Sequence, residues 1–251
     1  MCRMMGIVSQ GPVYYDLFEE FADLAVHGMC PIGAPDERGH KDGWGLVCFQ
    51  DGALAFHMRD VGSAPAASKY YGYAWKIAKL NVERGPGRSL VVLGHLRRAS
   101  SKERVAQKWS HPFVVERDGR AWAFQHNGAL LTGTKDPDRI DSQIIFEMLL
   151  EDLDGGTHEA VARATRAMRE RALAHHGGFT ALNFMLTDGS ALHVFRDFQM
   201  NGEYYTMYQD HLGEMVVTAS EPILGMKAEP LPKGVLCTIG ADLTVSRTSI
   251  V

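Results

Sequence analysis

The sequence predicts an α+β fold in which antiparallel sheets are covered by helices. Asp-Gly pairs stand between short apolar runs at 51–52, 118–119 and 188–189, and this dipeptide is the strongest local signal for a β-hairpin. Long amphipathic segments separate groups of hairpins, which is typical of helical layers packed on sheets. Two stacked sheets between helix layers fit this order.

The first half of the chain supplies two helices, one hairpin and one buried strand. Asp16 and Glu19 have the spacing of a capping box, and Gly28 is a plausible stop for the helix that they begin. A continuous apolar run at 89–95 indicates a strand buried on both faces. The expected elements are a helix at 16–27, a Gly- and Pro-rich loop at 31–43, strands at 44–49 and 53–58, a helix at 66–83, and a strand at 89–95.

The second half repeats the alternation. A hairpin precedes two amphipathic helices, and strands then continue to the end of the chain. The expected elements are strands at 113–116 and 121–126, helices at 141–153 and 157–175, and strands at 179–186, 191–195, 204–208, 215–219 and 235–239.

Composition excludes several functions. A net charge of -4 gives no electrostatic reason to expect nucleic acid or an anionic membrane as a partner. The longest apolar runs, such as 90–93, are too short to cross a bilayer, and the N-terminus lacks the pattern of a signal peptide. The four cysteines are far apart, which suits a reducing cytoplasm and predicts neither a metal site nor a cofactor held by thiols: Cys2, Cys30, Cys48 and Cys237.

Cys2 carries the first chemical signal. Removal of Met1 would leave a thiol and a free amine on one residue, and an α-amino group titrates at about 7.7–8.0. Such a residue carries its own general base. Alone, however, a cysteine at position 2 is more often a small residue that opens a buried strand.

Polar motifs stand at strand ends and at a helix start, where a buried sheet presents side chains to a pocket. Each has an ordinary reading by itself: Arg97 as a surface ion-pair partner, Asp141 as a helix-starting residue, and Asn127-Gly128 as a turn. Three histidines near these motifs are expected to be structural: His95, His111 and His126. The motifs are GHLRRAS at 94–100, HNG at 126–128, RIDSQ at 139–143 and HKDGWG at 40–45.

Together these motifs resemble those of the class II glutamine amidotransferases, which belong to the N-terminal nucleophile (Ntn) hydrolase superfamily. The resemblance spans essentially the whole chain, so it implies one amidotransferase domain over 1–251 and the family's four-layer α-β-β-α sandwich of two antiparallel sheets. The small single-domain members have segments similar to 40–45, 179–186 and 219–222. The family's order is kept by Met-Cys-Arg at the start and by 94–100, 110–113, 126–128 and 141–143.

The resemblance also implies the reacting groups. Cys2 matches the nucleophile that attacks the side-chain amide of glutamine. The side chain of Asn127 and the N–H of Gly128 match the two oxyanion donors, and a glycine permits the close backbone approach that such a donor needs.

The remaining site residues would hold the amino-acid end of the substrate. Arg97 matches the clamp on the α-carboxylate, which suits guanidinium geometry, and Asp141 matches the acceptor of the α-ammonium. Ser100 falls where the family usually has Thr and could add a hydroxyl to the carboxylate site. Arg98 falls where many larger members have Trp, so no role is assigned to it.

Three functions are compatible with these residues. The first is hydrolysis of glutamine through a γ-glutamyl thioester on Cys2, with the ammonia passed to a separate synthase subunit if transfer occurs. The second is hydrolysis of a different γ-glutamyl amide, with the difference expected in loops 31–43 and 102–110. The third, a non-catalytic subunit that retains the fold, ranks last because every expected site residue is present.

Overall fold

The computed structural model describes residues 2–30, 39–82, 88–134, 136–227 and 229–251. Its four α-helices are α1 (Tyr15–His27), α2 (Ser68–Val82), α3 (Asp141–Glu151) and α4 (His158–His176). Short 3-10 turns lie at Ala64–Ala66, Lys102–Arg104 and Gln107–Trp109. The strands are β1 (Arg3–Ser9), β2 (Gly43–Gln50), β3 (Ala53–Asp60), β4 (Leu90–Arg97), β5 (Phe113–Arg117), β6 (Arg120–Asn127), β7 (Asn183–Thr187), β8 (Ala191–Arg196), β9 (Tyr208–His211), β10 (Met215–Ala219), β11 (Glu229–Pro230), β12 (Val235–Gly240) and β13 (Val245–Ser249).

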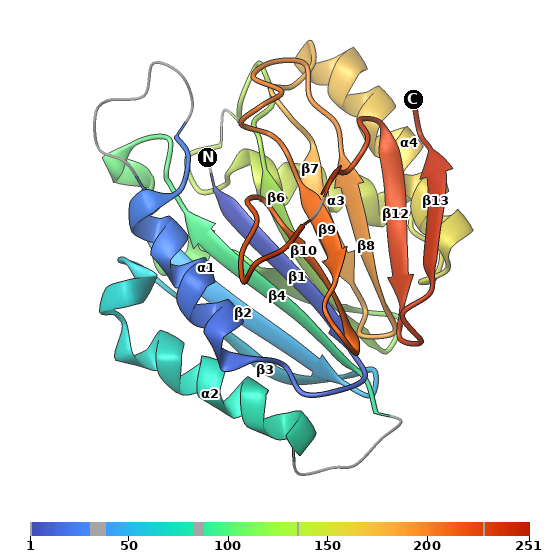
Figure 1. Cartoon of the computed structure of the whole chain (residues 1–251). Helices are drawn as coiled ribbons and strands as arrows, with labels where there is room; N and C mark the ends of the chain where they lie inside the picture. The colour runs from blue at the N-terminus through green and yellow to red at the C-terminus, as the bar shows by residue number, and fades with distance from the viewer. Residues whose placement is uncertain (1, 31–38, 83–87, 135, 228) are drawn as a thin grey trace.

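The strands form two antiparallel sheets that stack face to face (Figure 1). The seven-stranded sheet has the order β11-β9-β10-β1-β4-β2-β3, and the six-stranded sheet has the order β13-β12-β8-β7-β6-β5. Helices α1 and α2 cover the outer face of the first sheet, and α3 and α4 cover that of the second. The predicted four-layer sandwich is therefore confirmed.

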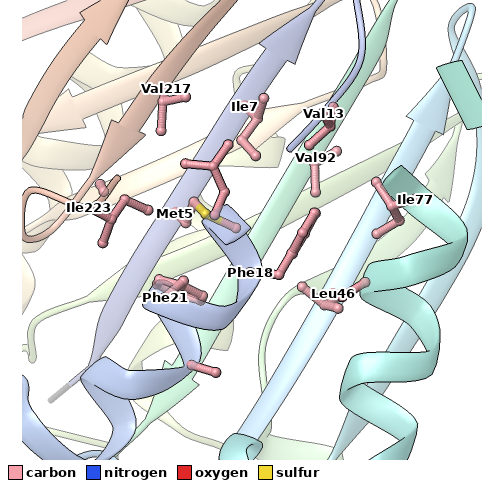
Figure 2. Packing of buried hydrophobic residues seen from close by; sticks show 14 of the residues in the cluster. Met5, Ile7, Val13, Phe18, Phe21, Leu46, Ile77, Val92, Val217 and Ile223 are labelled. Atoms are coloured by element: carbon pink, nitrogen blue, oxygen red, sulfur yellow. The ribbon is translucent and has the colours of Figure 1, made fainter. Parts of the chain in front are cut away.

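Three apolar cores hold the four layers together. One lies between α1, α2 and the first sheet, where Phe18 and Phe21 pack on Met5 and Ile7 (Figure 2). The second lies between α3, α4 and the other sheet. The third fills the space between the sheets, where β1 and β4 meet β7 and β8. Fully burying one large apolar side chain stabilises a fold by about 1.5–3 kcal/mol, so burial in these cores contributes much of the free energy that stabilises the fold.

Strand β1 lies at the centre of the first sheet, between β4 and β10. All seven of its residues are buried, with Met5 and Ile7 toward the helices and Met4 and Val8 toward the other sheet. At Gly6 an added Cβ would stand 2.8 Å from Leu192, so the packing of the two sheets leaves no room for a side chain at this position. This strand was not among the predicted elements, because Arg3 and Gly6 interrupt its short apolar run.

Several other predictions needed correction. The strand expected at 179–186 begins only at Asn183, because the backbone of Thr180 bonds instead to Ala129 and Gln199. The strand expected at 204–208 begins at Tyr208, since 202–205 form a turn. The capping box at Asp16 was also wrong.

Helix α1 starts at Tyr15, with Tyr14 as its N-cap and no hydrogen bond from a capping side chain. Asp16 therefore lies in the first turn of the helix and does not cap it. Gly28 does end it, with its N–H bonded to Leu24 O. Strand β13 was missed because its exposed polar residues show no apolar pattern. Most of the expected loop at 31–43 lies outside the described residues. No described helix is long and apolar enough to span a membrane.

Candidate active site

Most of the predicted site residues lie at the ends of four elements. Antiparallel pairing places the start of β1 beside the end of β4, with Arg3 opposite Leu96. Strand β6 of the other sheet ends at Asn127 on the same side, and α3 starts at Asp141. Between the sheets, Gln125 Nε2 donates to Met5 O at 2.9 Å and fixes their relative register. The site therefore lies where both sheets end.

Cys2 and Asn127 touch directly. The Cys2 N–H donates to Asn127 Oδ1 at 2.9 Å, and both residues are buried. Because Oδ1 is used as an acceptor, Nδ2 is the end of the amide that can donate to a substrate oxygen. Asn127 Nδ2 makes no hydrogen bond within the part of the chain that the structure describes.

Gly128 cannot be replaced by a larger residue without a shift of the backbone. Its φ is +150°, and an added Cβ would lie 1.9 Å from Ala181 O. Only glycine avoids both the strained conformation and this clash. The backbone at Gly128 therefore packs directly against the backbone of Ala181, in the segment that leads into β7.

The thiol of Cys2 is set to ionise. Burial raises its pKa, but the positive N-terminus of the chain, the His95 ring and the backbone N–H of Arg98 outweigh burial and lower the pKa of Cys2 to about 5. Burial raises the pKa of Cys48 to about 12, and it also raises the pKa of Cys237. The Cys2 thiol therefore ionises more readily than these two cysteines.

A buried network holds the start of β1. The Arg3 Nε lies 2.6 Å from Glu221 Oε1, and its guanidinium stacks over the Tyr204 ring at 4.3 Å. Glu221 also accepts the Met29 N–H at 2.8 Å, and Ser220 Oγ accepts the Met4 N–H at 3.0 Å. The segment 219–222, noted in the sequence only as a family similarity, therefore anchors the strand that carries Cys2.

Arg97 ends β4 close to Cys2. It is 4% exposed, and its Nη1 donates to Arg104 O at 2.7 Å. Burial lowers its pKa, while the charges of Cys2 and Asp42 oppose that decrease. A guanidinium stays protonated under such conditions, so it presents its remaining N–H groups to an anion.

Asp141 starts α3, and its neighbours in the sequence explain the motif around it. Its Oδ2 accepts the Leu130 N–H at 3.2 Å, and burial raises its pKa. Ser142 Oγ lies 3.0 Å from His126 Nδ1, and Gln143 Oε1 accepts the Ile140 N–H at 3.0 Å. Asp141 thus holds the backbone that follows β6, while Ser142 contacts His126 at the end of that strand and Gln143 fixes the helix start.

Ser100 is the site residue that the structure leaves apart from the others. It is exposed, and no hydrogen bond joins it to the other described site residues. Arg98 points elsewhere, with Nη1 at 3.0 Å from Cys30 Sγ and 3.4 Å from Gly39 O. Arg98 thus links the strand end to residues that flank segment 31–38, which lies outside the described residues.

The segment 40–45 supports the site rather than lining it. Asp42 Oδ2 accepts the Ala99 N–H at 2.8 Å, and its N–H donates to Arg97 O at 3.0 Å, which fixes the backbone that follows β4. Trp44 is buried against Tyr70 in the core below α2. Trp44 is therefore part of this core and does not belong to a loop over the site.

A cavity of about 300 Å³ lies beside the start of α3. It adjoins Asp141, because the Thr134 backbone bonds to Asp141 and the charge of His176 acts on it. Within the described ranges, no cluster of three or more His, Cys, Asp or Glu could hold a metal ion. The lining residues are Thr132, Gly133, Thr134, Ile144, His175 and His176.

Two stacked antiparallel sheets between helical layers form the fold of the Ntn hydrolases. A family model described as class-II glutamine amidotransferases matches residues 1–212. The chain belongs to the class II glutamine amidotransferases, as its motifs predicted.

Similar proteins of known sequence carry the same family description. YafJ of Escherichia coli (strain K12), an inferred glutamine amidotransferase, is 36% identical over 135 residues, which cover 54% of this chain and 45% of YafJ. An inferred glutamine amidotransferase of Haemophilus influenzae is 29% identical over 208 residues, covering 75% of this chain and 60% of that protein. The matched regions thus span about half of these relatives.

Solved structures support the fold alone, because their identities are low. A glutamine aminotransferase class-II domain protein from Silicibacter pomeroyi has a TM-score of 0.58 at 20% identity, with 99% of each chain covered. The glutamine phosphoribosylpyrophosphate amidotransferase from Bacillus subtilis has a TM-score of 0.55 at 12% identity, covering 99% of this chain and 49% of that one.

Four residues near the site were given no site role by the sequence: His95, Arg104, Tyr204 and Glu221. Arg104 connects the neighbourhoods of the two expected clamp residues, because its backbone oxygen accepts from Arg97 Nη1 at 2.7 Å and its own Nη1 donates to Arg139 O, two residues before Asp141. Tyr204 Oη donates to Cys2 O at 3.4 Å. Two of them lie in motifs that the sequence offered, His95 in 94–100 and Glu221 in 219–222. A motif does not say which of its residues faces the site.

Proposed function

We propose that this protein is a glutaminase, which releases ammonia from glutamine through a γ-glutamyl thioester on Cys2. The observation that carries the proposal is the hydrogen bond between Cys2 N and Asn127 Oδ1 at 2.9 Å. It joins a predicted nucleophile to a predicted oxyanion donor that is 125 positions away in the chain. Membership of the amidotransferase family supports the same substrate class.

In this proposal, the side chains divide the work in two. The Cys2 thiolate attacks the amide carbon, and Asn127 Nδ2 with the Gly128 N–H stabilises the negative oxygen that forms. Arg97 and Asp141 hold the α-carboxylate and α-ammonium, while Ser100 adds a hydroxyl at the carboxylate side. The two charges select a free amino acid over glutamine within a peptide.

The use of the ammonia belongs to the same proposal. We propose that residues 1–251 fold as one amidotransferase domain, and that a synthase in a separate subunit consumes the ammonia if transfer occurs. An acceptor would raise glutamine turnover when added to the purified protein. The synthase would bind an electrophile that the ammonia attacks.

The decisive experiment is a turnover screen of glutamine against a panel of other γ-glutamyl amides and against asparagine. Glutamine should be the best substrate, and asparagine should fail because its amide is one methylene short of Cys2. Faster turnover of another γ-glutamyl amide would replace glutamine with that compound. If no member of the panel is hydrolysed and an electrophilic glutamine analogue does not label Cys2, the enzymatic proposal fails and a non-catalytic role takes its place.

A further inference from the structure

Cys2 lies one residue before the strand pairing of β1 begins. The ladder with β4 starts at Arg3, opposite Leu96, and the ladder with β10 starts only at Met5. Removal of Met1 would make Cys2 the first residue of the chain, and the ends of a chain are poorly ordered unless other contacts hold them. A nucleophile in this place therefore depends on contacts outside the sheet.

Two side chains donate to the backbone oxygen of Cys2. Arg3 Nη1 lies 3.4 Å from that oxygen, and Tyr204 Oη also lies 3.4 Å from it. On the other side, Asn127 Oδ1 accepts the N–H of Cys2 at 2.9 Å. Because both its backbone nitrogen and its backbone oxygen are bonded, Cys2 keeps one orientation, and the bond from its Cα toward the thiol keeps one direction.

The Arg3 guanidinium is fully buried and is itself held on several sides. Its Nε lies 2.6 Å from Glu221 Oε1, its Nη2 donates to Met29 O, and its Nη1 also lies 3.5 Å from Tyr204 O. The guanidinium carbon lies 4.3 Å from the centroid of the Tyr204 ring. A planar guanidinium with N–H groups in fixed directions becomes a rigid support when it is surrounded in this way.

Stability alone does not account for an arginine at this position. Burying a charge is costly, and apolar side chains that fill the same volume are often equally or more stabilising. Met5 and Ile7, which share a face of β1 with Arg3, pack on the helices through apolar contacts. An apolar side chain at position 3 could fill the space, but it could not donate to the backbone oxygen of Cys2.

We propose that Arg3 is a positioning residue that holds the nucleophile through the backbone oxygen of Cys2, together with the hydroxyl of Tyr204. Glu221 and the Tyr204 ring keep the guanidinium in place. In the proposed reaction, this restraint directs the thiol toward the amide carbon of the bound substrate. The effect on turnover rests on the proposed glutaminase function, whereas the hold on Cys2 does not.

Carbonyl-carbon NMR of protein labelled at cysteine measures the hold on Cys2 without any substrate. The chain has four cysteines, so Cys2→Ala identifies the Cys2 signal by its loss. Arg3→Lys keeps a positive charge beside Glu221 but loses the guanidinium fork, and Tyr204→Phe removes only the hydroxyl. Since a hydrogen bond to a carbonyl moves its carbon signal downfield, both variants should shift the Cys2 signal upfield and broaden it.

Arg169→Lys is the matched control. Arg169 Nε also pairs with a carboxylate, that of Asp197 at 2.8 Å, and its guanidinium also lies over an aromatic ring, that of Phe179. Within the described ranges, no hydrogen bond or ion pair joins Arg169 to a candidate site residue, so the Cys2 signal should stay in place. A Cys2 signal that also stays in place in Arg3→Lys would overturn the proposal. Should Arg3→Lys not fold, an unmoved signal in Tyr204→Phe would overturn it.

Steady-state kinetics of glutamine hydrolysis separate positioning from stability. Arg3→Lys should lower kcat by about 10- to 100-fold and change KM by less than about threefold, because a small misplacement of the nucleophile slows the chemistry while the recognition residues stay intact. Arg169→Lys should keep both values. A higher KM with an unchanged kcat in Arg3→Lys would refute the positioning role. If the unchanged protein hydrolyses no γ-glutamyl amide, the glutaminase proposal fails, and the NMR shift still decides whether Arg3 holds Cys2.

Discussion

The reaction end and the recognition end of the candidate site are built in different ways. At the reaction end, Cys2, Asn127 and Gly128 are fixed by strand ends and by a backbone approach that leaves no room for a Cβ. At the recognition end, burial decreases from Arg97 through Asp141 to the exposed Ser100. The reaction end should therefore respond to substitution by losing chemistry, and the recognition end by losing affinity.

The largest effect is expected at the nucleophile. Cys2→Ala should abolish glutamine hydrolysis, because no other group can form the thioester. An electrophilic glutamine analogue should label Cys2 and spare the other cysteines, two of which have raised pKa values, Cys48 and Cys237. Circular dichroism and thermal unfolding should show that the variant keeps its fold. Activity that survives in Cys2→Ala, or label found on another cysteine, would refute the assignment.

Processing of the N-terminus should matter nearly as much. Retention of Met1 turns the Cys2 amine into an amide, which can neither give nor take a proton during the reaction. Intact mass spectrometry of active protein should show the loss of one methionine. A preparation that is shown to retain Met1 quantitatively and is still fully active would contradict this mechanism.

Asn127→Ala should mainly reduce kcat. Removal of one oxyanion donor typically costs about 10²–10³ in turnover, because that contact strengthens only as charge develops on the oxygen. Steady-state kinetics of glutamine hydrolysis measure the change. A variant with a higher KM and an unchanged kcat would move Asn127 from the reaction end to the recognition end.

Arg97→Ala and Asp141→Ala should mainly raise KM. Each removes a charged hydrogen bond to a part of the substrate that does not change during the reaction, which corresponds to roughly 1.5–3 kcal/mol or about 10- to 150-fold. The comparison with Asn127→Ala is the informative measurement. If these two variants lost only kcat while Asn127→Ala lost only affinity, the two ends would be wrongly divided.

Ser100→Ala should have the smallest effect. An exposed hydroxyl contributes at most a neutral hydrogen bond of about 0.5–1.5 kcal/mol, so KM should rise no more than several-fold. A larger rise in KM would show that Ser100 turns inward when substrate binds, so that all three recognition residues are buried in the complex.

Much of the fold could be predicted because its signals are local. The Asp51-Gly52 and Asp118-Gly119 pairs adopt the positive φ values that tight hairpins require, and both hairpins form where expected. Helices α3 and α4 show the expected apolar faces. Strand β1 escaped detection because Arg3 and Gly6 interrupt its apolar run. Residues 179–182 were predicted as strand, but hydrogen bonds to Ala129 and Gln199 replace strand pairing there.

The sequence by itself determined the residue types of the candidate site and the family to which the chain belongs. Motif order carried that information, since Cys2, Arg97, Asn127, Gly128 and Asp141 are each ambiguous alone. Only the tertiary structure decided which of them meet, because a contact between Cys2 and Asn127 depends on how two sheets stack and not on local preference.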